Sequence, residues 1–420
     1  MRRRLFGRRT RAQIVRAVGY TLLAGAAAQV AAAAAVISVD EVRKRRATPA
    51  AGFPSAPPRS VDVVGNRITT YTNGEDLYED MLTAIEGAKS SIFFEFFIWK
   101  DDEIGTRFKD ALIAAAERGV HVFVIYDGFA NLVVDPRFYR FPDSMHVLRF
   151  PVVRWGMLRL DLRHFGRDHR KIVVVDGDVG FVGGYNIGDL YATSWRDTHL
   201  RVQGPAVWEL TDAFVDFWNE YRHASRHPEL PERGAKEWNP DVRAARNAPS
   251  RMLFPVRGLY IDAIERAATH IYITQAYFIP DNEILTGLLK AARRGVDVRV
   301  IVPEYSNHII ADWVSRGYYS ELLAGGVTIW LYRDAMVHAK TATVDGMWST
   351  VGTANIDRLS MIGNYEVNLA LYSDDMAAKM QDIFEMDLGN CRQLTLEEWE
   401  QRGRLPRIAE ALLNPLHPLM

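Results

Sequence analysis

The sequence predicts an α/β protein made of two similar domains related by duplication, behind an N-terminal hydrophobic segment. Its 420 residues suit two domains of ordinary size rather than one. With 48% hydrophobic and 11% aromatic residues, the chain can build full cores, which excludes a disordered protein. The third observation is an internal repeat, in which a strand–helix–strand pattern and a polar motif each occur twice.

The N-terminal region, residues 1–46, combines a basic flank with an uncharged stretch. Seven arginines precede residues 17–39, which carry no charge and are long enough to span a hydrocarbon core of about 30 Å. Four more basic residues follow, and residues 47–59 are a Pro-, Ala- and Ser-rich linker. We favour a single uncleaved anchor, with a cleaved signal peptide and an Ala-rich soluble helix as alternatives. The larger positive charge before the segment favours a body outside the cytoplasm.

Two segments share one pattern of secondary structure. Residues 90–128 and 269–305 each read as an apolar strand, a polar turn, an amphipathic helix and a second apolar strand. Gly119 and Gly295 follow the helices and suit C-caps. Such units predict parallel strands with helices packed on the sheet, in a first domain over residues 60–235 and a second over 236–420.

A polar motif recurs later in each half. The first copy begins at His169 and the second at His338, with His, Lys, Asp, Gly and Asn at offsets 0, +2, +7, +14 and +17 in both. Its members in the two halves are His169, Lys171, Asp176, Gly183 and Asn186, and His338, Lys340, Asp345, Gly352 and Asn355.

The spacing indicates an anion-binding site. Residues i and i+2 of a strand share a face, so His169 and Lys171 project together. Glycines 183 and 184 let the backbone turn and bring Asn186 back toward them. Joining the two halves would gather two imidazoles, two ammoniums and two amides, a set suited to phosphate chemistry. One histidine would attack phosphorus while the other protonates the leaving oxygen.

Four carboxylates accompany the motifs. Asp197 and Glu366 lie 28 residues beyond the two histidines, and we expect them to accept the hydrogen bond of one imidazole N–H each and so orient the rings. We also count Asp176 and Asp345 among the candidate catalytic residues, because they belong to the motif. Because each precedes a glycine, we expect them to be structural or supporting rather than reactive.

Cysteine and charge limit the other classes of function. One cysteine, Cys391, excludes a disulfide framework and a thiolate metal site, and no zinc-binding pattern occurs. We therefore expect no metal and no other cofactor. Beyond residue 46 the chain carries 40 basic and 50 acidic residues, a balance that argues against nucleic acid as a partner.

The motifs match the HxK(x)4D(x)6GSxxN signature of the phospholipase D superfamily, and the chain most resembles bacterial cardiolipin synthases. This closer resemblance rests on residues 99–105, 181–188, 195–207, 276–281 and 294–299. It implies two phospholipase D-like domains, each a mixed sheet flanked by helices, related by a pseudo-two-fold axis. It also implies a membrane-associated enzyme of the bacterial cell membrane that joins two phosphatidylglycerols into cardiolipin and releases glycerol, with no protein partner implied.

The resemblance also assigns roles to residues. His169 would be the nucleophile and His338 the general acid and base of a metal-independent, ping-pong reaction. Four side chains would bind phosphate: Lys171, Lys340, Asn186 and Asn355. The serine of the signature is replaced by Gly184 in the first motif and Thr353 in the second. Since glycine lacks the hydroxyl, we expect one phosphate or backbone contact to be missing beside Gly184.

Three alternatives to a synthase remain open: a phospholipase D hydrolase with water as acceptor, a phosphodiesterase nuclease, and an inactive lipid-binding scaffold. The segment 129–168 interrupts the repeat with seven arginines interleaved with aromatic residues. It suits either contact with anionic lipid or single-stranded nucleic acid, or a loop whose aromatics are core. The apolar residues 411–420 could contact lipid or pack on the body.

Overall fold

The computed structural model describes residues 52–403 except 160 and 236, together with 407 and 410. Within that part of the chain, no helix has both the length and the apolar character needed to cross a bilayer. The predicted anchor at residues 17–39 and the apolar residues 411–420 lie outside the described residues.

The first half folds into an eight-stranded sheet with the order β1-β2-β9-β7-β6-β3-β4-β5. Its strands are β1 (Arg59–Val63), β2 (Asn66–Tyr71), β3 (Ser91–Phe96), β4 (His121–Asp127), β5 (His146–Phe150), β6 (Lys171–Val175), β7 (Val179–Gly183) and β9 (His199–Gln203). Strands β3, β4 and β5 run parallel, as the repeat predicts, and the other pairs are antiparallel.

The second half repeats this arrangement in the order β10-β17-β16-β15-β11-β12-β13-β18. Its strands are β10 (Val242–Asn247), β11 (His270–Gln275), β12 (Asp297–Pro303), β13 (Thr328–Tyr332), β15 (Lys340–Val344), β16 (Trp348–Gly352), β17 (Glu366–Tyr372) and β18 (Cys391–Leu394). Seven strands of each sheet, from β2 to β5 and from β10 to β13, occupy matching places. The predicted duplication of a mixed α/β sheet is therefore confirmed.

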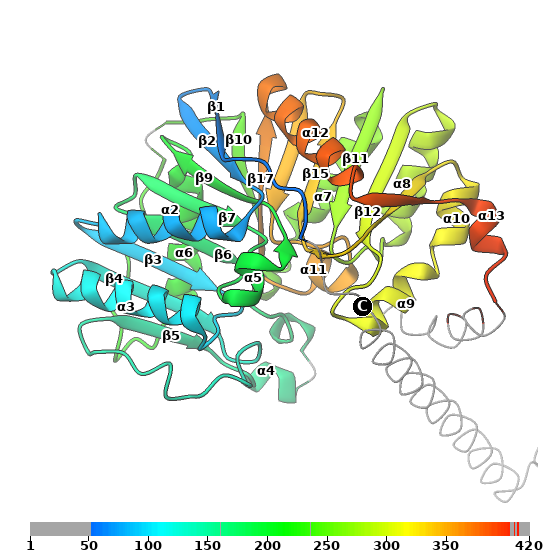
Figure 1. Ribbon diagram of the computed structural model, residues 1–420. Helices are drawn as coiled ribbons and strands as arrows, with labels where there is room; N and C mark the ends of the chain where they lie inside the picture. Colours follow the sequence, from blue (N-terminus) through cyan, green and yellow to red (C-terminus); the bar gives the residue numbers. More distant parts are fainter. Residues whose placement is uncertain (1–51, 160, 236, 404–406, 408–409, 411–420) are drawn as a thin grey trace, which may run out of the picture.

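Helices cover both sheets, and the two halves lie side by side in Figure 1, the first in blue to green and the second in yellow-green to orange. The longer helices are α2 (Gly74–Glu86), α3 (Glu103–Glu117), α6 (Val207–Tyr221), α7 (Pro255–Arg266), α8 (Asn282–Arg293), α9 (Ile309–Arg316) and α12 (Asp374–Leu388). The shorter ones are α4 (Trp155–Leu158), α5 (Asp189–Thr193), α10 (Tyr319–Ala324), α11 (Arg358–Ile362), α13 (Leu396–Glu400), η1 (Leu162–His164) and η2 (Pro249–Arg251).

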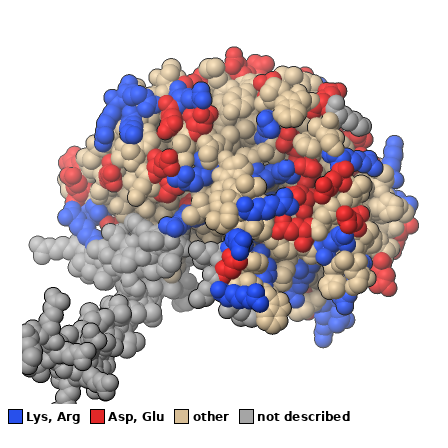
Figure 2. Space-filling model, turned by 180° about the vertical axis from the view of Figure 1, so that it is seen from behind, with Lys and Arg blue, Asp and Glu red and all other residues tan. Residues whose placement is uncertain are grey.

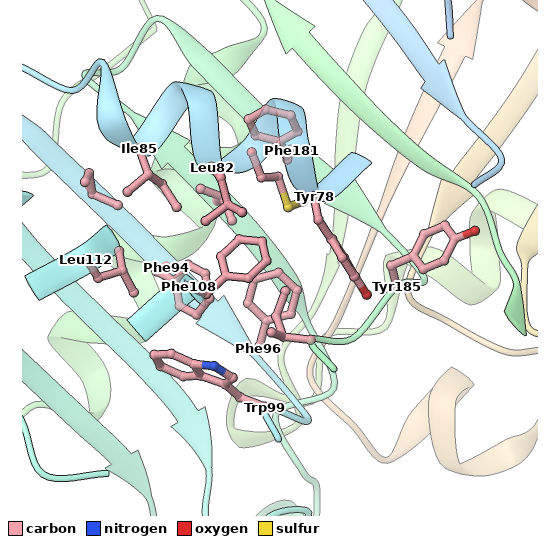
Figure 3. Packing of buried hydrophobic residues seen from close by; sticks show 14 of the residues in the cluster. Tyr78, Leu82, Ile85, Phe94, Phe96, Trp99, Phe108, Leu112, Phe181 and Tyr185 are labelled. Carbon is pink, nitrogen blue, oxygen red and sulfur yellow. The ribbon is translucent and has the colours of Figure 1, made fainter. Parts of the chain in front are cut away.

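Separate cores hold each half and the junction between them. In the first half, α2 and α3 pack on the sheet through Leu82, Phe108 and Leu112, which meet Phe94 and Trp99 (Figure 3). A further cluster spans the junction and includes Ile172, Val182 and Leu200 of one sheet with Val351 and Leu369 of the other. Because this apolar cluster is shared, the two sheets are held at fixed positions relative to each other.

Matching caps fix where the helices of the two strand–helix–strand units begin and end. The side chain of Asp102 accepts a hydrogen bond from Gly105 N at the start of α3, and Asp281 caps α8 in the same way. The predicted C-cap glycines, Gly119 and Gly295, have φ angles of 90° and 91°, which residues with a Cβ atom rarely adopt.

The structure places the motif aspartates away from the histidines. Asp176 follows the five-residue strand β6, about 16 Å along it from Lys171. Its carboxylate accepts hydrogen bonds from the backbone N–H groups of residues 89, 90 and 91 and from Ser90 Oγ, at 2.7–2.9 Å. Asp345 ties residues 268–270 in the same manner. These contacts favour the structural role that their Asp-Gly turns predict.

We expect Asp176→Ala to lower the free energy of unfolding by about 2 kcal/mol, because it leaves three backbone donors without their charged acceptor. Thermal unfolding measures the loss, and Asp178→Ala, at an exposed neighbour in the same turn, is the matched control. The turnover of the folded Asp176→Ala protein should stay within a few-fold of wild type. A collapse of turnover without a loss of stability would restore Asp176 to the catalytic set.

Candidate active site

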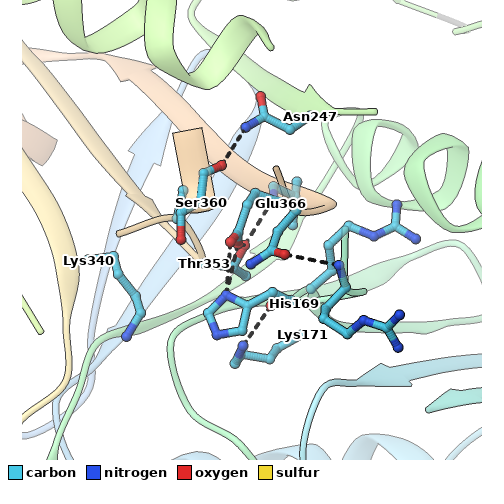
Figure 4. A network of polar contacts seen from close by, with 12 residues as sticks. His169, Lys171, Asn247, Lys340, Thr353, Ser360 and Glu366 are labelled. Carbon is cyan, nitrogen blue, oxygen red and sulfur yellow. Dashed lines mark hydrogen bonds and ion pairs between the residues drawn. The ribbon is translucent and has the colours of Figure 1, made fainter. Parts of the chain in front are cut away.

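His169 is positioned by a short backbone pairing between the two halves, which we call a strap. Asp168 forms an isolated parallel bridge with Tyr365, and His169 N donates to Tyr365 O at 3.0 Å. The next residue in the second half is Glu366, whose two carboxylate oxygens both lie 3.0 Å from His169 Nδ1 (Figure 4). With Nδ1 engaged by the carboxylate, Nε2 of His169 is the nitrogen left for a substrate.

His338 is positioned by the equivalent strap. The short strands β8 (Trp195–Arg196) and β14 (Met336–Val337) pair in parallel, and His338 N donates to Arg196 O at 2.7 Å. Asp197 is the next residue, and its Oδ2 lies 2.6 Å from His338 Nδ1. A buried bidentate ion pair between Arg196 and Asp387 of α12, at 2.8 and 2.9 Å, holds this strap to the second half.

Each imidazole is therefore supported by the carboxylate of the other half. The equal offset of 28 residues identifies Asp197 and Glu366, but it does not tell whether each pairs within its own half or across the junction. In the structure both pairs cross, so one half alone would leave its histidine without an orienting carboxylate.

Both motif lysines are fully buried next to the histidines. Lys171 Nζ donates to His169 O at 2.6 Å, and Lys340 Nζ donates to His338 O. Lys340 Nζ also lies 3.0 Å from His338 Nδ1, and its side chain points toward Lys171 and His169 (Figure 4). The structure thus brings together the two histidines, the two lysines and the two carboxylates that the spacing predicts.

Thr353 and Gly184 show how the two carboxylates are accommodated differently. Thr353 Oγ1 donates to Glu366 Oε2 at 2.6 Å. A Cβ atom at Gly184 would stand 2.1 Å from Asp197 Oδ1, so only glycine leaves room for this carboxylate. The expectation of a missing contact beside Gly184 is therefore incomplete, because the shorter Asp197 occupies the space and accepts a bond from Thr198 N at 2.7 Å.

The two motif asparagines are buried at matching turns. Asn186 Oδ1 accepts a hydrogen bond from Ile98 N at 3.2 Å. Among the described residues, Asn355 Oδ1 has no hydrogen-bond partner. The turns themselves are fixed by equivalent parallel bridges, Trp99 to Ile187 in the first half and Phe278 to Ile356 in the second.

Burial and the two ammonium groups set the charge state of the site. Burial, followed by the charges of Lys171 and Lys340, holds the pKa of His169 well below its usual value. Burial and the same two lysines lower the pKa of His338. Burial also lowers the pKa of Lys171 to about 7 and that of Lys340 to about 8, although nearby carboxylates oppose the change. At neutral pH both imidazoles are therefore uncharged.

We expect kcat/KM to fall as the pH rises through 7 to 8, whereas below this range deprotonation of Glu366, whose pKa burial raises to about 7, acts in the opposite direction. The pKa values of Lys171 and Lys340 are lowered to about 7 and about 8, so the free enzyme loses its phosphate-binding charge above this range. A bound phosphodiester raises both lysine pKa values, and the fall in kcat should then appear at higher pH than the fall in kcat/KM. Steady-state rates from pH 6 to 10 measure both. A kcat/KM that stays flat to pH 9.5 would contradict this charge assignment.

Sequence reasoning missed a further buried carboxylate and the aromatic walls. Asp357 caps α11 by accepting a hydrogen bond from Ser360 N at 2.6 Å, and burial raises its pKa to about 7. The sequence contained a signal for Asp357, because it lies two residues after Asn355, whereas the matching position in the first half is a glycine. The ring of Phe97 lies 4.7 Å from that of His169, and Trp195 lies 4.9 Å from His338.

Among the described residues, no three His, Cys, Asp or Glu side chains come together in a group that could hold a metal ion. Cys391 is half-buried in β18, where its Sγ donates to Asp387 O at 3.1 Å.

Comparison with known proteins identifies the family. A family model described as the phospholipase D-like domain of cardiolipin synthase matches residues 81–218 and 260–388. The chain belongs to this family. The two matched segments contain the two polar motifs, so the family model covers both halves of the site.

Individual relatives agree with this assignment. The major cardiolipin synthase of Bacillus subtilis strain 168 is 35% identical over 370 residues, which cover 84% of this chain and 76% of that protein. Cardiolipin synthase 1 of Bacillus cereus is 33% identical over 84% of this chain and 73% of its own length. The crystal structure of phosphatidylserine synthase from Haemophilus influenzae Rd KW20 has a TM-score of 0.65 over 86% of this chain and 95% of its own, at 16% identity, and shares the fold.

Proposed function

We propose that this family member is a cardiolipin synthase that transfers a phosphatidyl group from one phosphatidylglycerol to another and releases glycerol. The observation that carries the proposal is one buried site made from both halves, with two carboxylate-supported imidazoles and two lysines. The similarity to cardiolipin synthases over 84% of the chain supports this choice of substrate.

In the first half-reaction, Nε2 of His169 attacks phosphorus and the bond from phosphorus to the glycerol oxygen breaks. Glu366 holds the Nδ1 proton and stabilises the positive charge that forms on the ring. Lys171 and Lys340, with the amides of Asn186 and Asn355, would hold the phosphate oxygens. The phosphodiester charge raises the pKa of His338, so this imidazole takes up a proton and gives it to the departing glycerol.

In the second half-reaction, the headgroup hydroxyl of another phosphatidylglycerol takes the place of the departed glycerol. Neutral His338, held by Asp197, accepts its proton while the oxygen attacks phosphorus and the bond to His169 breaks. Cardiolipin leaves and both imidazoles return to their starting state. Because both lipid substrates reside in membranes, we propose that the enzyme works at the bacterial cell membrane, held there by residues 17–39.

The proposal is tested by incubating purified, detergent-solubilised protein with phosphatidylglycerol alone and resolving the lipid products. We expect cardiolipin and free glycerol in equal amounts, both absent with His169→Ala. Phosphatidic acid in place of cardiolipin would favour a phospholipase D hydrolase. With no product from a folded sample, the next substrates are phosphatidylethanolamine and single-stranded DNA.

We expect EDTA to leave the rate of phosphatidyl transfer unchanged, because the proposed steps use only imidazole, ammonium and amide groups. Rates are measured in detergent micelles after the protein has been dialysed against EDTA, and the dialysed protein is then assayed with added Mg²⁺ or Ca²⁺. A loss of activity that either ion restores would contradict the proposed mechanism.

A further inference from the structure

The segment that interrupts the repeat, residues 129–168, is divided between core and surface. Phe138, Tyr139 and Phe141 pack around Trp99, which agrees with a loop whose aromatics are core. Trp155, in contrast, is 83% exposed. The core alternative therefore describes residues 138–141, and the part around Trp155 is left exposed on the surface.

Six exposed apolar side chains, in residues 129–133, in residues 153–165 and at Met252, form what we call the apolar rim. It comprises Phe129, Val133, Val153, Trp155, Phe165 and Met252, whose exposed fractions lie between 43% and 83%. Single exposed apolar residues are common on proteins, but a group drawn from three separate segments marks an interaction surface.

Backbone and side-chain contacts hold these three segments together. The guanidinium of Arg167 lies 5.5 Å from the ring centre of Phe129 and donates to the carbonyl oxygens of Pro151 and Val152 at 3.1 and 3.0 Å. Gly166 lies close to the segment that carries Met252, since a Cβ atom added to Gly166 would stand 3.1 Å from Pro249 Cγ. The rim is therefore a built surface rather than a set of loose loops.

The rim also adjoins the active site. Phe165 lies four residues before His169, in the same strap that seats the imidazole: Arg167 N bonds to Asn364 Oδ1 at 2.9 Å, and Tyr365 N bonds to Arg167 O at 2.9 Å. Figure 1 places α4, which carries Trp155, at the lower edge of the molecule beneath α5 and α11. A lipid held at this surface would thus have its headgroup near the phosphate site.

The charge of this region complements anionic lipid. Residues 149–167 contain five arginines and one acidic residue, Asp161, which is paired with Arg163 at 2.8 Å. Arg149 and Arg159 are exposed. On the face of the molecule seen in Figure 2, basic and acidic side chains are interspersed. Arg154, next to Trp155, is buried, so the exposed Arg149 and Arg159 supply the charge that faces solvent. An exposed tryptophan with exposed arginines in the same segment is typical of surfaces that enter the interfacial region of a bilayer.

We propose that the apolar rim docks on the surface of an anionic bilayer and brings the active site close to phospholipids that stay in the membrane. The inference rests on the proposed function, since it assumes a lipid substrate. It explains how a diacyl substrate reaches a buried phosphate site while its acyl chains remain among other lipids.

Site-specific fluorescence tests the proposal with the full chain. In a background of Cys391→Ser, which removes the single native thiol, and His169→Ala, which prevents consumption of lipid, Trp155→Cys is labelled with nitrobenzoxadiazole. Trp238→Cys is the matched control, because Trp238 is 82% exposed and precedes β10 at the opposite edge. Any N-terminal anchor is shared by both proteins, so a difference between the labels reports how the body is oriented.

With vesicles of equal phosphatidylglycerol and phosphatidylcholine, we expect the label at 155 to shift to the blue and to be quenched by lipid spin-labelled near the headgroup. The label at 238 should respond little. Equal quenching at the two positions, or none at 155, would overturn the proposal. So would a change at 155 that follows protein concentration without lipid, because a second copy of the chain would then cover the rim.

Activity separates this inference from the proposed function. The double variant Trp155→Ser, Met252→Ser should lose about tenfold in kcat/KM on phosphatidylglycerol vesicles and stay within twofold in detergent micelles. Trp238→Ser should match wild type in both. An equal loss in micelles would overturn docking but leave the proposed function intact. Quenching at 155, combined with the finding that the protein with an intact His169 makes no cardiolipin, would overturn the proposed function and leave docking intact.

Discussion

We expect His169→Ala to lower turnover of phosphatidylglycerol by at least about 10⁴-fold, because no other group in the site replaces the nucleophile of a covalent mechanism. His169 Nε2 is the free nitrogen of a neutral imidazole whose Nδ1 faces both oxygens of Glu366. Steady-state synthesis of cardiolipin in micelles measures the loss. His338→Ala should be similarly inactive with phosphatidylglycerol, since glycerol is a poor leaving group without a proton donor.

The control for this prediction is His121→Ala, which removes an exposed histidine at the start of β4. It should retain full activity. His169→Ala should also keep the unfolding temperature within a few degrees of wild type, which separates lost chemistry from lost fold. Residual activity of His169→Ala within a hundredfold of wild type would be incompatible with a covalent role for this residue.

The second large effect concerns the crossed carboxylates. Glu366→Gln and Asp197→Asn should each lower kcat by about 10² to 10⁴, because an amide cannot stabilise an imidazolium and favours the wrong tautomer. The steps affected should differ. Glu366→Gln should slow formation of the covalent intermediate on His169, although Glu366 belongs to the other half of the chain. Asp197→Asn should slow the proton transfers made by His338.

Rapid mixing with a phosphatidyl ester of p-nitrophenol separates these steps, because this leaving group departs without a proton. The burst of p-nitrophenol should be slow in Glu366→Gln and of normal rate in Asp197→Asn. If the two effects were exchanged, the crossed pairing would not describe the working enzyme. A loss of only a few-fold in Asp197→Asn would show that this residue does not orient His338.

Periodicity and repetition in the sequence predict much of this architecture, because they report local geometry. The strand–helix–strand units, their glycine caps and the placement of His169 beside Lys171 all follow from spacing along one chain. The pairing of each carboxylate with the histidine of the other half does not follow from spacing. Asp197 and Glu366 lie at equal offsets from the two histidines, so pairing within a half and pairing across the junction look the same in sequence. Parallel bridges between residues 197 and 141 positions apart decide it.

Gly184 illustrates a second limit of the sequence. Comparison with the signature shows only that Gly184 lacks the hydroxyl of the usual serine. In the structure it provides the space that the carboxylate of Asp197 occupies, while the longer Glu366 pairs with Thr353 in the other half. Such compensation between residues distant along the chain becomes visible only when both are placed in space. The division of the segment 129–168 into core and rim is likewise set by packing against Trp99.

The central claim, one site built from both halves with His169 as the nucleophile, is tested most directly by mapping the covalent intermediate. His338→Ala is mixed with the p-nitrophenyl substrate, quenched within milliseconds, digested and examined by mass spectrometry. We predict about one phosphatidyl group per protein chain, attached to the peptide that contains His169, and none in His169→Ala. Attachment to any other residue, or release of p-nitrophenol without an adduct, would contradict the claim.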